Sequence, residues 1–229
     1  QAGVSSSSAF CVAWVQALAK LANQTKSPLE IAQMAHKAEV THFGAPGGTM
    51  DHVTSALGGI VRIGPDPWQI QTLSSKQGVW VLADSGEPKD TMKHLRRCKH
   101  DRLELYRKLG NCWSHAPSSV DLTAEEKVLL EATLTNKTTE EQAALKWNSA
   151  SGQELGALML QHHEALSHGL QLSTKRLEAM KDAAMDNGAW GYKLVGSGGG
   201  GCAVAWCSEN VSQQVTKAME EAGAVKTYL

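Results

Sequence analysis

Apolar positions in the first ninety residues predict helices followed by strands. Residues 9–21 are almost uninterruptedly apolar and rich in alanine, a length and composition that favour a buried helix over a strand. The sequence Ser27-Pro28-Leu29-Glu30 combines an N-cap, a proline at the first helical position and a capping-box glutamate, so a second helix is expected to start there. It is expected to end near Val40, ahead of a glycine-rich loop and a short apolar segment at 50–57. Proline and glycine turns then separate three predicted strands, at 60–63, 69–73 and 79–83.

A soft boundary near residues 85–89 separates this part from a mainly helical one. Residues 90–109 have apolar positions near helical spacing and a basic surface, and Thr123 with Glu126 and Thr138 with Glu141 form two capping boxes that predict helix starts. Further helices are expected at 153–166 and 174–186, followed by a strand at 192–195, a glycine loop, a strand at 202–207, a helix at 211–221 and a strand at 225–229. The predicted fold class is therefore mixed α/β (α+β) in two domains, residues 1–86 and 87–229.

Composition and charge exclude several classes of protein. The 22 Lys and Arg residues balance 23 Asp and Glu residues, so the net charge of −1 gives no electrostatic reason for nucleic-acid binding. The longest apolar runs are far shorter than the roughly 20 residues of a membrane span, so no membrane partner is expected. Five irregularly spaced cysteines without a CxxC pair favour a reducing, cytoplasmic location. The chain opens inside a loop without an initiator Met, so an N-terminal segment of the same protein, absent from this chain, is an expected partner.

The opening Gly3-Val4-Ser5-Ser6-Ser7-Ser8 leads directly into the first predicted helix. Unpaired backbone N–H groups at the positive end of a helix attract phosphate, and the adjacent hydroxyls are oxygen ligands suited to Mg²⁺. The alternative, a serine-rich terminus that only caps a helix, stays open on these residues alone.

Asp51 follows the glycine loop at 44–49 and precedes the apolar segment. A glycine loop lets a ligand approach the backbone, and a carboxylate beside it can orient a substrate hydroxyl or accept its proton. An aspartate that caps a short helix is the commoner alternative. No other carboxylate of the chain lies in so constrained a sequence context.

Residues Gly196–Gly201 join two predicted strands with five glycines in six positions. Because glycine costs backbone entropy, such a run favours close approach of a ligand or a neighbouring loop over a mobile hairpin turn.

His162, His163 and His168 form the densest group of histidines. Adjacent helical residues point about 100° apart, so His162 and His163 are poorly placed to chelate one ion, and surface or capping roles are expected.

In this order, the serine turn, the stretch Gly48-Thr49-Met50-Asp51-His52 and the late glycine loop resemble the GHMP family of small-molecule kinases, which includes galactokinase, homoserine kinase, mevalonate kinase and phosphomevalonate kinase. The stretches at 38–51 and 55–58 look most like its galactokinase branch. The resemblance implies a two-domain fold, with an incomplete N-terminal portion like domain 2 of ribosomal protein S5 and a ferredoxin-like C-terminal domain. It also implies ATP-dependent phosphorylation of a monosaccharide, at the anomeric hydroxyl. The alternatives are another small alcohol such as mevalonate, or a non-catalytic regulator that binds sugar and ATP.

The resemblance also implies roles for individual residues. Asp51 would be the catalytic carboxylate and would contact the substrate together with Gly48, while Ser7 would ligate Mg²⁺. His52 stands where galactokinases usually carry Gln. The residues implied to bind ATP are Gly3, Val4, Ser5, Ser6, Ser7, Gly196, Ser197, Gly198, Gly199 and Gly200.

Overall fold

The computed structural model describes residues 4–229 except 46, 65, 89–90, 112 and 114–119, and of residues 91–97 only the backbone. The chain divides into two compact units, Val4–Ser75 and Lys76–Leu229, which are described separately below. The division precedes the strand Val79–Asp84, because this strand is hydrogen-bonded into the sheet of the second unit. The assignment of residues 1–86 and 87–229 to two family domains stays a prediction.

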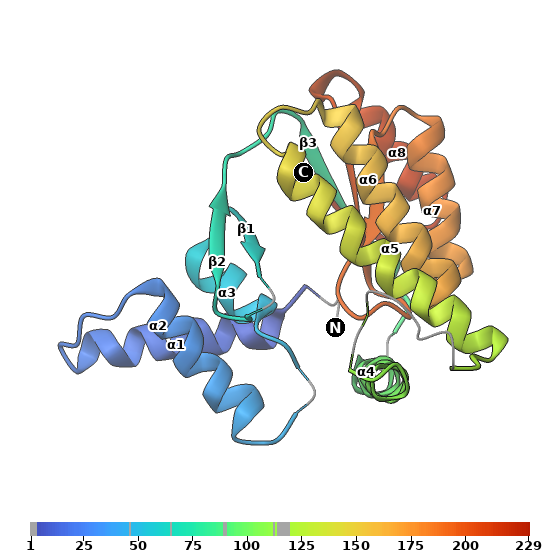
Figure 1. The fold of residues 1–229 in the computed structure, drawn as a ribbon. Helices are drawn as coiled ribbons and strands as arrows, with labels where there is room; N and C mark the ends of the chain where they lie inside the picture. The colour runs from blue at the N-terminus through green and yellow to red at the C-terminus, as the bar shows by residue number, and fades with distance from the viewer. Residues whose placement is uncertain (1–3, 46, 65, 89–90, 112, 114–119) are drawn as a thin grey trace. The chain divides into compact units, whose positions relative to one another are not determined.

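The first unit consists of helices and one small antiparallel hairpin (Figure 1). The predicted capping box is formed, since the Glu30 N–H donates to Ser27 Oγ at 3.2 Å and the Ser27 N–H donates to the Glu30 carboxylate at 2.8 Å. The apolar segment after the glycine loop is a helix, and the predicted strands at 60–63 and 69–73 pair with each other. In chain order the elements are α1 (Ser6–Leu21), α2 (Pro28–His36), the π-helical turn η1 (Lys37–Thr41), α3 (Met50–Leu57), β1 (Ile60–Ile63) and β2 (Ile70–Leu73).

The core of the first unit is small. Val12 of α1 packs against Ile31 and Ala35 of α2, with Ala56 of α3 beside them. The prediction of a buried first helix is wrong for its outer face, where Phe10, Trp14 and Leu21 are 69%, 58% and 80% exposed. Within this unit only α2, η1 and α3 pack against α1, so the helix buries a single stripe.

The second unit is a four-stranded antiparallel sheet with helices (Figure 1). The predicted helix start at Thr138 is wrong, because α5 runs through this position and the Thr138 hydroxyl donates to carbonyls of its own preceding turn. The strand order is β4-β5-β3-β6. The elements are β3 (Val79–Asp84), α4 (Thr91–Lys108), α5 (Ala124–Lys146), α6 (Gly152–Glu164), the π-helical turn η2 (Ala165–Gly169), α7 (Lys175–Asp186), β4 (Gly191–Leu194), β5 (Cys202–Cys207), the 3₁₀ turn η3 (Glu209–Val211), α8 (Ser212–Glu221) and β6 (Lys226–Tyr228).

The main hydrophobic core lies on one face of this sheet. Alternate residues of the three strands β3, β4 and β5 point to it, since side chains of a strand alternate between the two faces. Helices α7 and α8 cover this face with fully buried residues. The buried set includes Val81, Ala83, Tyr192, Leu194, Ala203, Ala205, Leu177, Met180, Ala184, Val215 and Met219.

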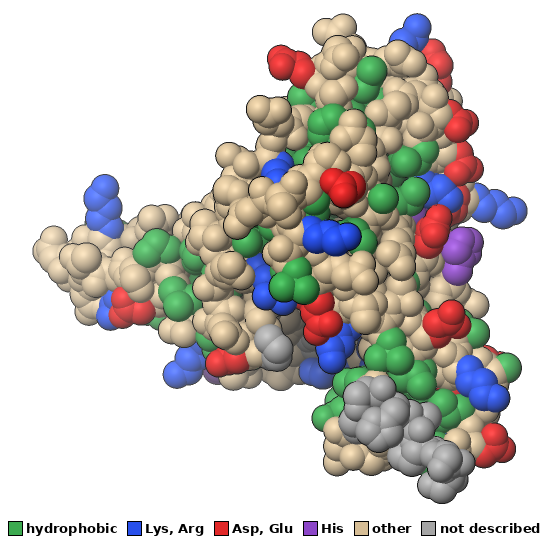
Figure 2. Space-filling model, turned by 45° about the horizontal axis from the view of Figure 1, so that its top comes forward, with side chains coloured by type: hydrophobic (Ala, Val, Ile, Leu, Met, Phe, Trp, Pro, Cys, Tyr) green, Lys and Arg blue, Asp and Glu red, His purple; other side chains and the backbone are tan. Residues whose placement is uncertain are grey.

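Charged side chains of both signs are interspersed on the face of the molecule drawn in Figure 2. Within the described ranges, no helix combines the length and the apolar character needed to cross a membrane.

Candidate functional site

The serine turn starts α1 with an unusual backbone. Ser5 has φ 59° and ψ 31°, the left-handed conformation, and its side chain makes no capping hydrogen bond to the helix. The first N–H groups of an α-helix have no helical carbonyl partner, and the side chain of the N-cap residue Ser5 does not cap them here. The alternative of a purely capping serine turn is therefore not favoured, and Ser5, Ser6 and Ser7 surround a helix end suited to an anion. Gly3 lies outside the described residues.

In the first unit, the apolar faces of three helical segments each continue into a polar residue, and these polar residues form one cluster. Ser8 lies one turn before Val12 on α1, and Glu39 lies one turn after Ala35 on the α2–η1 stripe. His52 lies one turn before Ala56 on α3. Residues four apart share one helix face, so the apolar contacts of the three helices continue directly into a polar cluster.

Glu39 is the centre of this cluster. Its Oε2 lies 2.7 Å from His52 Nε2. Partial burial raises the pKa of Glu39, but the nearby hydroxyls of Ser7 and Ser8, together with the His52 imidazole, outweigh burial and hold the pKa below its usual range. Glu39 is therefore an ionised carboxylate at neutral pH, beside the residue predicted to ligate Mg²⁺.

Glu39 is not among the site residues predicted from the sequence, in which Asp51 is the carboxylate with the most constrained context. A signal was present, because Glu39 falls at the i+4 position of the apolar stripe formed by Ile31 and Ala35. A carboxylate in such a stripe is expected to have a polar partner from another element.

Asp51 lies in the first turn of α3 and is half-buried. Its carboxylate makes no hydrogen bond or ion pair that ties it to another described side chain, whereas the N-cap of α3 is Thr49, whose hydroxyl donates to the Pro67 carbonyl at 3.1 Å. A Cβ added to Gly48 would meet none of the described atoms within 4 Å. Neither Asp51 nor Gly48 is thus explained by the packing of the described residues.

The side chain of His52 is almost fully buried and packs against the aromatic ring of His36. The His52 ring meets the His36 ring edge-on, with centroids 5.2 Å apart, and His36 in turn meets Trp68 at 5.5 Å. Burial, followed by repulsion from His52, lowers the pKa of His36.

The glycine loop of the second unit is held by neighbouring backbone. The Gly199 N–H donates to the Leu172 carbonyl at 2.7 Å, and the Gly201 N–H donates to the Glu87 carbonyl at 3.1 Å. A Cβ on Gly198 would lie 2.3 Å from the Leu172 oxygen, and one on Gly200 would lie 2.8 Å from the Glu87 oxygen. The loop therefore makes the close approach to a neighbouring loop that the sequence predicted.

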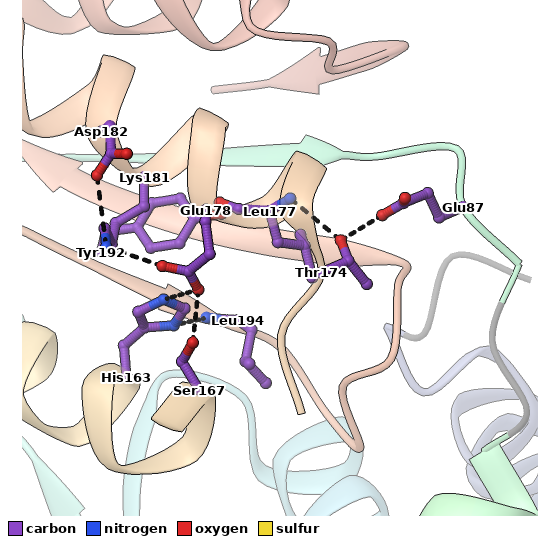
Figure 3. Close-up of polar contacts among 10 residues, drawn as sticks. All are labelled: Glu87, His163, Ser167, Thr174, Leu177, Glu178, Lys181, Asp182, Tyr192 and Leu194. Carbon is purple, nitrogen blue, oxygen red and sulfur yellow. Dashed lines mark hydrogen bonds and ion pairs between the residues drawn. The ribbon is translucent and has the colours of Figure 1, made fainter. Parts of the chain in front are cut away.

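Two further side chains, Ser197 and Thr174, bear on the nucleotide contact predicted for this loop. Ser197 Oγ is buried without a hydrogen-bond partner among the described residues. Thr174 caps α7 by accepting from the Leu177 N–H at 3.2 Å and donates to the Glu87 carboxylate (Figure 3). Thr174 thereby fixes the segment on which the loop rests.

His163 belongs to a buried network in the second unit, so the prediction of a surface or capping role is wrong for it (Figure 3). Its Nδ1 accepts from the Leu194 N–H at 3.2 Å, and its Nε2 donates to Glu178 Oε1 at 3.1 Å. Glu178 also accepts from Ser167 and Lys181, both at 2.8 Å. Partial burial raises the pKa of Glu178, but the hydrogen bonds, led by that of Lys181, lower it to about 2. This network fastens α6 and α7 to strand β4.

Family models match both ends of the chain. The model of the GHMP kinases N terminal domain matches residues 1–59, and that of the GHMP kinases C terminal domain matches residues 142–225. The mevalonate kinase of Pyrococcus abyssi is 32% identical over 223 residues, which cover 97% of this chain and 60% of the relative. The galactokinase of Streptomyces coelicolor is 26% identical over 245 residues, which cover 97% of this chain and 62% of the relative.

Solved structures share the fold at low identity. The galactokinase of Lactococcus lactis, complexed with galactose, superposes with a TM-score of 0.80 at 14% identity over 95% of this chain and 62% of its own. The mevalonate kinase of L. major, in complex with R-mevalonate, gives a TM-score of 0.70 at 22% identity over 98% of this chain and 64% of its own.

The chain belongs to the GHMP kinase family and has its mixed α/β fold, which confirms both the resemblance and the predicted fold class. It spans about 60% of the length of the curated relatives it matches.

Proposed function

We propose that the protein transfers the γ-phosphate of ATP to a hydroxyl of a small alcohol, and that mevalonate is the first acceptor to test. Mevalonate kinases from Pyrococcus and Thermococcus are 28–32% identical to this chain, and galactokinases are 26% identical. This ranking favours mevalonate over the sugar acceptor expected from the sequence, and the sugar becomes the second candidate.

The observation that carries the proposal is the polar cluster at the start of α1. Uncapped N–H groups of this helix would bind phosphate oxygens, as helix N-termini do. The Ser7 hydroxyl and the Glu39 carboxylate, whose pKa the Ser7 hydroxyl helps to lower, would hold Mg²⁺. Their oxygens fit this ion, because Mg²⁺ is bound through one or two protein oxygens together with phosphates and waters. Bound Mg²⁺ would neutralise charge on the phosphates.

Asp51 would act on the acceptor. It lies in the first turn of α3, one residue before the histidine that contacts Glu39, and its carboxylate has no described partner to compete with a substrate hydroxyl. A carboxylate so placed can orient the hydroxyl and accept its proton, while Gly48 leaves room for the acceptor.

The glycine loop would contact the nucleotide. Ser197 Oγ, buried without a partner among the described residues, would donate to it, and the backbone of Gly196, Gly198, Gly199 and Gly200 would line it. The hydrogen bonds from Gly199 and Gly201 to neighbouring carbonyls keep this loop rigid before a ligand arrives.

The test uses the natural full-length protein with Mg²⁺ and ATP. Release of ADP is followed with R-mevalonate, galactose and a panel of other small alcohols, and the phosphorylated product is identified by mass spectrometry. Turnover with mevalonate supports the proposal. Turnover with galactose alone would make the sugar the acceptor, and ATP binding without transfer to any alcohol would overturn the proposal in favour of a regulator.

Asp51→Asn is the diagnostic variant. It should reduce kcat by at least about 100-fold and leave the Kd for ATP within a few-fold, because its proposed contact is with the acceptor. Asp186→Asn, at the exposed end of α7, is the matched control and should be unchanged. A large loss of ATP binding in Asp51→Asn would contradict the assigned role.

A further inference from the structure

We infer that His52 is a positioning residue, whose hydrogen bond fixes the Glu39 carboxylate in the orientation that binds the metal beside Ser7. This inference rests on the proposed function, because it deepens the description of the same site. Nothing in the sequence comparison assigns a role to His52.

The contact joins two elements at the site. His52 Nε2 lies 2.7 Å from Glu39 Oε2, the short distance typical of a hydrogen bond to an ionised carboxylate. Since Glu39 is ionised and can only accept, Nε2 must carry the proton. The donor lies on α3 next to Asp51, whereas the acceptor lies on η1, so one hydrogen bond links the proposed metal ligand to the helix of the proposed catalytic carboxylate.

The surroundings leave this hydrogen bond little freedom. The His52 side chain is almost fully buried, and the His36 ring, itself packed on Trp68, blocks one side of the imidazole. The imidazole therefore cannot follow a moving carboxylate, and the carboxylate is held where the imidazole directs it. The hydroxyls of Ser7 and Ser8 also favour the charged form of Glu39, but serine hydroxyls rotate and fix a direction less well than the 2.7 Å contact with His52 does.

A purely structural role explains the geometry less well. His52 Nδ1 is buried and has no hydrogen-bond partner among the described residues, so the imidazole leaves a polar atom unsatisfied. An apolar side chain of similar size would avoid that cost, and Glu39 would keep its two serine partners. Loss of the imidazole is thus expected to affect the function of Glu39 more than the stability of the unit.

The experiment compares three variants of the natural full-length protein. His52→Leu removes the donor, His52→Gln keeps an N–H donor at a similar reach, and His36→Phe keeps the aromatic contact while leaving the hydrogen bond intact. For each variant we propose to measure kcat and KM, the thermal unfolding midpoint, and Mn²⁺ binding by electron paramagnetic resonance in the presence of a non-hydrolysable ATP analogue.

His52→Leu should lower kcat at least about 10-fold and weaken Mn²⁺ binding about 10-fold, with the unfolding midpoint within about 3 °C of the wild type. His52→Gln and His36→Phe should stay within about 3-fold of the wild type in both measurements.

Two results would overturn the inference. One is unchanged Mn²⁺ binding in His52→Leu, and the other is an equal loss in His36→Phe, which would point to ring packing instead of the hydrogen bond. Wild-type protein that binds Mn²⁺ but phosphorylates no alcohol would refute the proposed function, while the Mn²⁺ affinities of the variants would still decide the role of His52.

Discussion

Replacing His163 with leucine tests the buried network of the second unit. The imidazole makes hydrogen bonds to two elements, because Nδ1 accepts from the Leu194 N–H on β4 and Nε2 donates to Glu178 on α7. Leu194 lies on β4, an edge strand of the sheet, so its outward N–H has no strand partner. Leucine fills much of the same space but removes both hydrogen bonds.

The expected loss of unfolding free energy follows from the polar groups that lose a hydrogen-bond partner in His163→Leu. A buried backbone N–H without an acceptor costs about 1–3 kcal/mol, and one lost hydrogen bond to a charged group costs about 1.5–3 kcal/mol. Glu178 keeps Ser167 and Lys181 as donors, so the second cost falls at the lower end. We therefore expect His163→Leu to lower the free energy of unfolding by about 3–4 kcal/mol.

The assay combines urea unfolding at pH 7 with amide hydrogen exchange of the peptide that contains Leu194. In His163→Leu this amide should exchange faster, because its acceptor is gone. The control is His163→Gln, which offers both an acceptor and a donor and should lose only about half as much stability. A loss below about 1 kcal/mol in His163→Leu, with unchanged exchange at Leu194, would refute the assignment of the network.

Three further outcomes are expected. Gly198→Ala should destabilise by more than about 3 kcal/mol in urea unfolding, because φ is +70° and a Cβ would lie 2.3 Å from a backbone oxygen. Gly110→Ala, with φ +69° and no atom of the described residues within 4 Å of the added Cβ, should cost only about 1–2 kcal/mol, and equal costs of the two substitutions would contradict the collision. Burial lowers the pKa of His162 from 6.5 to about 4, so the unfolded chain binds a proton that the folded chain does not, and stability falls as pH drops from 6.5 towards 4. His162 accounts for a fall of about 2 kcal/mol in the free energy of unfolding between pH 8 and pH 5. This contribution should disappear in His162→Asn and persist in His168→Asn. A pH dependence of stability in His162→Asn parallel to that of the wild type would contradict it. Ser197→Ala should raise the Kd for ATP about 3- to 10-fold without lowering the unfolding midpoint, and an unchanged Kd would remove Ser197 from the proposed nucleotide contacts.

Local signals in the sequence were sufficient for most elements. The capping boxes at Ser27 and Thr123 form as predicted, because each is complete within four residues. No helix starts at the capping box predicted at Thr138, because this position lies inside α5. Extending an existing helix costs less free energy than ending it and starting a new one. The exposed face of α1 also escaped prediction, because composition indicates that residues are apolar but not what packs against them.

For the candidate site, the residue types and their order along the chain could be read without a structure: a serine turn before a helix, an aspartate after a glycine loop, and a glycine-rich hairpin. These are local features, and each predicts a kind of contact through the backbone near it. They sufficed to identify the family but left the acceptor open between a sugar and another alcohol.

Which side chains contact each other depends on how the helices and strands pack. Glu39 lies 13 residues from His52 in the chain, and Glu178 lies 15 residues from His163, yet each pair is within hydrogen-bonding distance. Packing of separate helices brings these groups together, and hydrogen bonds to ionised carboxylates then fix proton positions that no sequence pattern specifies. The physical reason is that a hydrogen bond requires a donor–acceptor distance correct to within a few tenths of an ångström, and that distance is set by how whole elements pack.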